Sequence, residues 1–161
     1  MMSKVLAVFL AAGLVLVAQD LPETAKSALD RAGKAWKEQR YAETEEAFLL
    51  ASRLDPKDPS IPMMLASLLY LQPEPDPFHP SKDRASRIQR ASAAYRKAIE
   101  IDPSPMAISA FANFPSNERI FQPEPQKSQF ASEAESLFKR LLQLQPNDLR
   151  VLQTFGSLAF D

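Results

Sequence analysis

The sequence of 161 residues predicts an all-α protein made of three helical hairpins and a terminal helix. Three prolines, Pro56, Pro103 and Pro146, each follow an apolar stripe with the same spacing. Twelve, eight, five and two residues before each proline stand, in order, a small residue, an aromatic residue, a small residue or leucine, and an aliphatic residue. Steps of four, three and three follow the period of an α-helix and not that of a strand. One helical pattern that recurs three times predicts an array of similar units.

The residue types in these columns indicate how neighbouring helices pack. A small side chain lets a second helix approach closely, and an aromatic side chain one turn further fills the volume between them. The aromatic column consists of Phe48, Tyr95 and Phe138. A proline cannot continue the helical hydrogen-bond ladder, so each unit ends near its proline. We therefore expect the three aromatic residues to occupy equivalent places between helices.

A helix-start signal follows each of the three prolines. The dipeptides at 58–59 and 104–105, Asp-Pro and Ser-Pro, place a capping acceptor before a proline in the first helical turn. Asn147 and Asp148 offer a cap before Leu149. First helices are expected near 25–39, 59–71, 105–114 and 149–161.

These units resemble the tetratricopeptide repeat (TPR), whose pattern runs W-x2-L-G-x2-Y, then A-x3-F, then P. The first half is matched by Leu152-x2-Phe155-Gly156-x2-Ala159, and the second half by Ala91-x3-Tyr95 and Ala134-x3-Phe138. The resemblance covers roughly residues 24–161 and implies a right-handed solenoid of antiparallel helix pairs. The expected repeats span about 25–58, 59–104 and 105–148, with a half repeat at 149–161.

The spacing of the repeats departs from that family. Pro56, Pro103 and Pro146 lie 47 and 43 residues apart, whereas successive repeats of the family lie about 34 residues apart. The excess is expected inside repeats two and three, in proline-rich loops at 72–80 and 115–126 that both contain Gln-Pro-Glu-Pro. Prolines push the preceding residues toward extended geometry, so we expect these loops not to be helical. The second helix of repeat two is expected to begin near Ser81.

The N-terminal segment 1–18 has the features of a signal peptide. Lys4 precedes a run of fourteen uncharged, apolar residues from Val5 to Ala18. A membrane span needs about 20 such residues, whereas this run has the length of a signal-peptide core. We expect cleavage after Ala18, export of residues 19–161 to the periplasm or the exterior, and no stable membrane span afterwards. An uncleaved anchor and a buried N-terminal helix are the alternatives.

Composition argues against most catalytic and cofactor sites. The chain has no cysteine, one histidine and three glycines, which leaves no material for a thiolate site, a His-rich metal site or a glycine-rich phosphate loop. The net charge of −1 argues against sequence-independent nucleic-acid binding. We expect no catalytic residue, no metal and no cofactor. His79 is expected to be an exposed loop residue, and the basic residues at 82–90 to form a solvated helix surface.

The expected function is that of an exported, non-catalytic scaffold that binds a peptide or a helix of another protein. In the TPR family the first helices often line a concave ligand groove, which implies a binding surface on the first helices here. The candidate partner-binding residues are Lys26, Trp36, Met63, Tyr70, Leu158 and Phe160. Trp36 is also interpretable as a core or groove-edge residue. Some family members clamp a peptide carboxylate with Lys and Asn; only Lys26 and Asn113 come close to that pattern, so that activity is not carried over.

Two alternatives remain open at this stage. The chain is also interpretable as the N-terminal portion of a larger exported enzyme or envelope assembly factor. A further alternative is self-association through the helix at 149–161, which is apolar nearly all round, whereas solenoids need polar ends. We expect that helix to pack on 127–144 through Leu152, Phe155 and Ala159. Val151, Leu158 and Phe160 would then stay uncovered.

Overall fold

The computed structural model describes residues 23–74 and 81–160, with side chains up to Ser157 in the last helix. The predicted signal peptide at 1–18 and His79 lie outside these residues. The described part contains seven α-helices and one short 3-10 helix. They are α1 (Ala25–Lys37), α2 (Tyr41–Leu54), α3 (Ser60–Leu71), α4 (Arg84–Ile101), α5 (Pro105–Glu118), η1 (Arg119–Phe121), α6 (Gln126–Leu144) and α7 (Leu149–Phe160).

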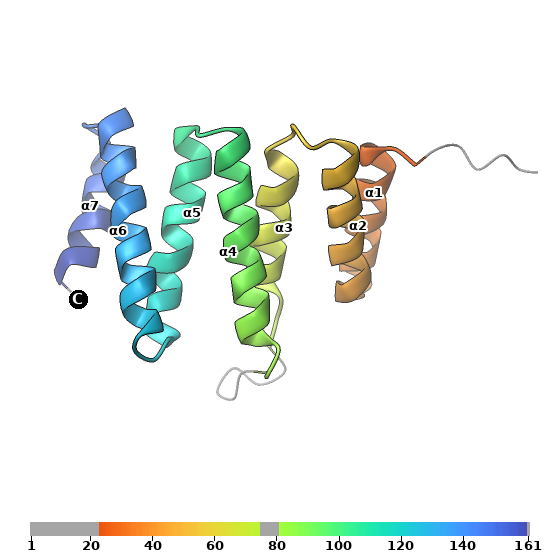
Figure 1. Ribbon diagram of the computed structural model, residues 1–161, viewed down its shortest axis with the longest axis horizontal. Coiled ribbons are helices and arrows are strands. Elements are labelled where there is room, and N and C mark those ends of the chain that lie inside the picture. The colour runs from red at the N-terminus through yellow and green to blue at the C-terminus, as the bar shows by residue number, and fades with distance from the viewer. Residues whose placement is uncertain (1–22, 75–80, 161) are drawn as a thin grey trace, which may run out of the picture.

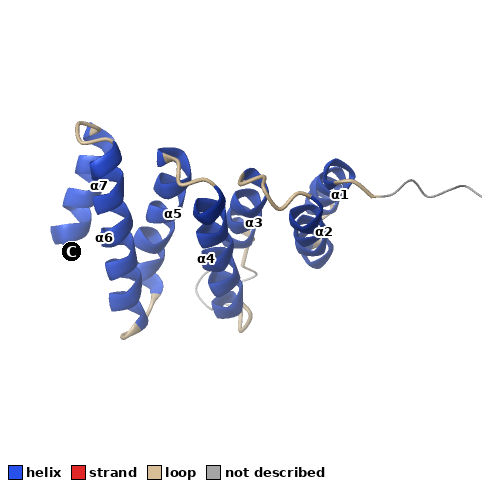
Figure 2. Ribbon diagram, turned by 45° about the horizontal axis from the view of Figure 1, so that its top comes forward, coloured by secondary structure: helices blue, strands red, loops and turns tan. Residues whose placement is uncertain are grey.

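The helices stack as antiparallel hairpins. The pairs α1–α2, α3–α4 and α5–α6 each pack closely, and α7 packs on α6. The first helices form one layer and the second helices the other, as Figure 1 and Figure 2 show from two angles. This arrangement confirms the predicted all-α array of about three hairpins plus a terminal helix.

The three aromatic residues singled out by the repeat lie in the core, as predicted. Phe48, Tyr95 and Phe138 are all buried. Tyr95 stacks on Phe111 of the following hairpin, with ring centroids 5.6 Å apart. Its hydroxyl lies 3.2 Å from the Ser67 hydroxyl on α3. Tyr95 therefore joins its own hairpin to the next one.

The predicted capping residues start the helices. Asp58 accepts the backbone N–H of Ser60 at 2.8 Å. The hydrogen-bonded helix α3 begins at Ser60, one residue later than expected, although Pro59 already has helical dihedral angles. The Ser104 hydroxyl accepts a backbone N–H in the first turn of α5. Asp148 accepts the backbone N–H of Arg150 at 2.9 Å at the start of α7. Each bond satisfies an N–H that has no partner within the helix.

The prediction of a non-helical segment at 115–126 is wrong for its first half. Helix α5 continues through Pro115 to Glu118, and η1 extends the coil to Phe121. The ring of Pro115 is fully buried, so packing offsets the backbone hydrogen bond that a proline lacks. Only the segment from Gln122 to Pro125 is non-helical. In hairpin two, α4 begins at Arg84, three residues after the expected start.

The packing of α7 also differs from expectation. Val151 is buried, although we expected it to be uncovered, and Leu152 is 42% exposed, although we expected it to pack on α6. Phe155 is half-buried and lies 6.2 Å from Phe138, measured between ring centroids. Val151 and Phe155 are four residues apart, so they share the face that meets α6. The side chains of Leu158, Ala159 and Phe160 lie outside the described residues.

Candidate functional site

The candidate residues on α1 and α3 are spread along two helices. Lys26 is exposed in the first turn of α1. Trp36 is half-buried and meets Tyr41 edge-on, with ring centroids 5.3 Å apart. Met63 and Tyr70 are half-buried and pack against the core. Leu158 and Phe160 have no described side chains, so the structure does not place them.

Tyr70 lies beside a buried charged cluster. Its ring meets Phe114 edge-on at 5.2 Å. Burial, followed by the nearby Glu118 carboxylate, raises the pKa of Tyr70 above its ordinary value of 10.0, against a smaller opposing effect of Arg84. The hydroxyl therefore stays protonated at neutral pH. This environment gives Tyr70 a packing role, whether or not it also contacts a ligand.

The expected solvated basic surface on α4 is wrong for its first two arginines. Arg84 donates to both carboxylate oxygens of Glu118, at 2.5 and 2.9 Å, and the Glu118 side chain is completely buried. Arg87 is buried and pairs with Glu74. Arg90, further along α4, keeps an exposed side chain and pairs with Glu45 on α2. Arg84 and Arg90 therefore join hairpin two to its neighbours, and Arg87 pairs within hairpin two, so these three arginines do not form a free ridge for an acidic ligand.

Glu74 lies at the edge of this cluster. Burial acts to raise the pKa of Glu74, but hydrogen bonds from Ser81 and Arg87 together outweigh it and hold the pKa below its ordinary value of 4.5. The bond from the Ser81 backbone N–H is 2.9 Å long. In its charged form, Glu74 therefore links the segment that follows α3 to the segment that precedes α4.

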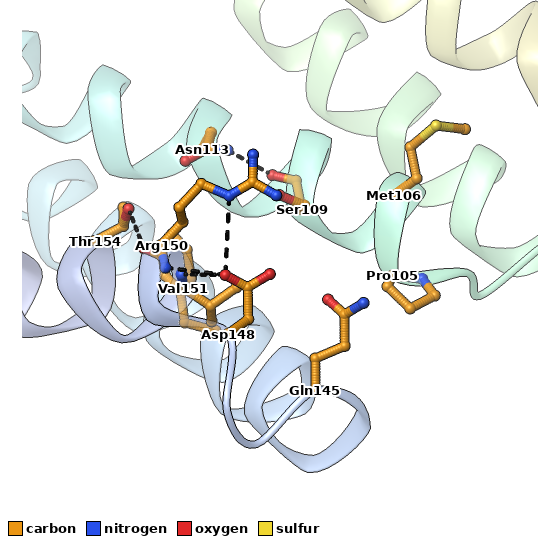
Figure 3. Close-up of a pocket in the computed structure, with 10 residues that line it drawn as sticks. Pro105, Met106, Ser109, Asn113, Gln145, Asp148, Arg150, Val151 and Thr154 are labelled. Carbon is orange, nitrogen blue, oxygen red and sulfur yellow. Dashed lines mark hydrogen bonds and ion pairs between the residues drawn. The ribbon is translucent and has the colours of Figure 1, made fainter.

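A cleft of about 530 Å³ lies between α5 and α7, both helices of the first layer. Figure 3 shows its two walls, with Ser109 and Asn113 on α5 and Arg150 and Thr154 on α7. Its full lining is Pro105, Met106, Ser109, Asn113, Phe138, Gln145, Asp148, Arg150, Val151 and Thr154. The lining mixes one apolar edge with several hydrogen-bonding groups.

Arg150 is the main charged group of this cleft. Its side chain is 92% exposed, and its Nε lies 3.9 Å from an oxygen of Asp148. Asp148 is meanwhile engaged by backbone N–H groups at the start of α7. Across the cleft, the Asn113 amide donates to the Ser109 carbonyl at 2.9 Å and is exposed. A planar cation and an amide facing one cleft can hold a carboxylate and a peptide group.

None of the six candidate partner-binding residues lines this cleft, and Asn113 was considered for a carboxylate clamp but not proposed. Met106, Ser109, Arg150 and Thr154 were missed, because each is an ordinary polar or flexible residue on a helix surface. A signal was nevertheless present, since Met106 and Arg150 each stand two residues after the capping residue of their helix, Ser104 and Asp148. Residues at equivalent positions of successive first helices share one face of the first layer.

The described residues contain neither a cluster of metal-ligating side chains nor a helix that could span a membrane. Within 23–74 and 81–160, no three potential metal-ligating side chains cluster together. No helix in this part of the chain is both long and apolar enough to cross a bilayer.

Together, the stacked hairpins and the first-layer cleft define a TPR-like helical repeat domain. No known protein family and no curated protein matches the sequence. Among solved structures, the first TPR of Spaghetti (RPAP3) bound to the HSP90 peptide SRMEEVD has a TM-score of 0.54 at 18% identity, covering 84% of this chain and 93% of that one. The second TPR domain of human RPAP3, in complex with the HSP70 peptide SGPTIEEVD, has a TM-score of 0.55 at 16% identity, covering 84% and 94%. The Arabidopsis OM64 TPR domain has a TM-score of 0.52 at 15% identity, covering 83% and 93%. These likenesses establish the TPR fold of this chain.

Proposed function

We propose that this protein is a non-catalytic scaffold that binds a peptide of a partner protein across its first-helix layer, with the α5–α7 cleft as the central contact. The observation that carries the proposal is the cleft itself, in which the exposed Arg150 faces Asn113 between two first-layer helices. TPR domains are typically scaffolds without catalytic activity. Two of the similar structures are TPR domains with bound chaperone peptides, which supports the same mode of action here.

The charge of the cleft defines the kind of peptide. Arg150 offers a guanidinium group largely in solvent, and such groups bind carboxylates through paired hydrogen bonds. The peptides in the two similar complexes both end in Glu-Glu-Val-Asp. We therefore propose a ligand that presents an acidic residue to Arg150. Met106, which is 68% exposed at the rim, offers an adaptable apolar contact beside it.

A peptide titration tests this proposal. The probe is fluorescein-labelled SRMEEVD, and the readout is anisotropy at low and high salt. Arg150→Glu should weaken binding about tenfold or more, because a charge-assisted bond becomes a repulsion. Asn113→Ala should weaken binding by a smaller factor. Arg53→Glu, an equal charge change at an exposed site on α2, should leave the affinity unchanged. Equal binding by the Arg150 and Arg53 variants would refute the assignment of the cleft.

We further propose that the protein is exported after cleavage behind Ala18. The support is the sequence of residues 1–18 alone, with its basic start and its run of fourteen apolar residues. The remaining chain would start at Gln19 and carry a net charge of −2, since 18 basic and 20 acidic residues remain. Intact-mass measurement of protein from the periplasm or the medium should show this start. Recovery of only full-length protein from the cytoplasm would rule out export.

A further inference from the structure

A second groove, of about 940 Å³, lies between α4 and α6 in the layer of second helices (Figure 1). Among the described helices, α4 and α6 each pack on α5 and hardly on each other. The wall on α4 consists of Gln89, Ser92, Arg96 and Ile99. These residues recur every three or four positions, so they share one face of the helix. Helix α6 forms the other wall, and the buried ring of Phe111 on α5 forms the floor.

One ion pair crosses this groove. Nε and Nη2 of Arg96 donate to the same oxygen of Glu133, Oε1, at 3.0 and 2.6 Å. The Arg96 guanidinium also lies over the Phe111 ring, 5.7 Å from its centroid. In the described part of the chain, Nη1 of Arg96 and Oε2 of Glu133 have no hydrogen-bond partner. The pair therefore offers a donor group and an acceptor atom to a ligand, while its two charges cancel.

The hydroxyl group of Ser92 adds an unsatisfied polar atom to the same wall. Ser92 is 5% exposed, and within the residues that the structure describes its Oγ has no hydrogen-bond partner. Other helical hydroxyl groups of this protein donate to the carbonyl oxygen four residues earlier, as those of Thr44 and Ser67 do at 3.0 Å. A buried hydroxyl group without a partner is uncommon, because it has lost water and gained nothing in return. Since Ser92 lines the groove, a bound ligand is able to supply the missing hydrogen bond.

We propose that the α4–α6 groove binds a short, uncharged, extended segment of a partner protein that carries a bulky apolar side chain. Apart from the balanced ion pair of Arg96 and Glu133, every side chain that lines the groove is neutral. A charged segment would lose its hydration here without gaining an opposite charge. Each peptide group of an extended segment brings one donor and one acceptor, as the ion pair and the Ser92 hydroxyl group require. The half-buried side chains of Ile99 and Phe130 offer the apolar contact.

The length of the groove also fits a peptide segment. Gln89 and Ile99 stand ten residues apart on α4, which is about 15 Å along the helix axis. About four or five residues of extended chain span that distance. The groove shares no lining residue with the α5–α7 cleft, so each site can be tested without the other.

Selection from a random heptapeptide library displayed on phage tests the proposal. The library is panned on the immobilised full chain, and the enriched peptides are synthesised with acetylated and amidated ends and titrated by fluorescence anisotropy. We expect these peptides to lack charged residues and to share an apolar residue. Gln129→Trp, at an exposed position of α6 on the groove wall, should obstruct the groove and weaken binding about tenfold. Gln143→Trp is the matched control on the same helix, because Gln143 is exposed and lines neither the groove nor the cleft; it should leave binding unchanged.

A second variant separates a contact with the ligand from a structural role. Ser92→Ala should weaken binding of the selected peptides about fivefold, through the loss of one hydrogen bond. It should not lower the melting temperature, because the Ser92 hydroxyl group makes no hydrogen bond within the described residues. Unchanged affinity, or a loss of affinity together with a lower melting temperature, would contradict the assignment of Ser92 to the site.

Four results would overturn the proposal as a whole. The first is the absence of any peptide enriched above the library background. The second is equal binding by the parent and Gln129→Trp, which would place the peptides elsewhere. The third is the enrichment of acidic peptides only, whose binding is lost in Arg150→Glu, because those peptides would occupy the α5–α7 cleft. The fourth is a parent dimer in sedimentation that Gln129→Trp converts to a monomer, which would make a second copy of this chain the occupant.

Discussion

Replacing Glu118 with alanine should destabilise the protein more than any exposed charge replacement. Glu118 has no solvent exposure and accepts three hydrogen bonds, two from Arg84 and one of 2.6 Å from Gln122. Removing one partner of a buried ion pair costs about 3–5 kcal/mol, because the other charge stays buried without compensation. The Arg84 side chain is 20% exposed and keeps its contact above the Phe121 ring. We therefore expect the lower end, about 3 kcal/mol.

The assay is thermal unfolding followed by circular dichroism. A loss of about 3 kcal/mol corresponds to a fall of about 6–12 °C in melting temperature for a chain of this size. Glu133→Ala is the control, because Glu133 pairs with an Arg96 side chain that is 52% exposed, and exposed pairs contribute only about 0–1 kcal/mol. The double variant with Arg84→Met and Glu118→Leu should recover most of the lost stability, since no charge is left buried.

A small effect at Glu118 would refute this reasoning. If Glu118→Ala and Glu133→Ala lower the melting temperature equally, by less than about 2 °C, the buried pair contributes no more than an exposed one. If Glu118→Ala loses all cooperative unfolding, the stability of all the hairpins depends on this buried pair. In that case Glu118→Gln, which keeps the shape and one acceptor, should restore a measurable transition.

Three further predictions follow from the packing and the charges. Phe48→Ala and Phe138→Ala should each lower the free energy of unfolding, measured with denaturant, by about 3–5 kcal/mol. Leu144→Ala is the control and should lower it much less, because Leu144 is 51% exposed. Equal losses would show that the repeat register is wrong. The stability that Glu74 contributes through its lowered pKa is present above its ordinary pKa of 4.5 and is lost as pH falls through the lower pKa of the folded state. The gap in unfolding free energy between the parent and Glu74→Gln should therefore shrink as the pH falls below 4.5, and a constant gap would contradict this prediction. Gly156→Ala should raise stability by up to about 1 kcal/mol, because alanine favours helix and the added carbon meets nothing; a lower melting temperature would mean that this face is covered in solution.

Sequence reasoning was able to predict the hairpins because their determinants are local and repeated. The columns around Phe48, Tyr95 and Phe138 follow from helical periodicity, and the caps at Asp58 and Ser104 follow from short-range hydrogen bonding. Both kinds of signal lie within a few residues of the structure that they specify. The predicted core and helix starts are accordingly close to the observed ones.

The remaining features depend on contacts between residues distant in the sequence. Arg84 and Glu118 are 34 residues apart, and neither carries a local sign of burial. That pair and the buried ring of Pro115 keep α5 helical, where the prolines predicted a loop. The cleft depends likewise on how α5 and α7 face each other, so the position of Arg150 two residues after its helix cap is not enough to identify it as a cleft residue.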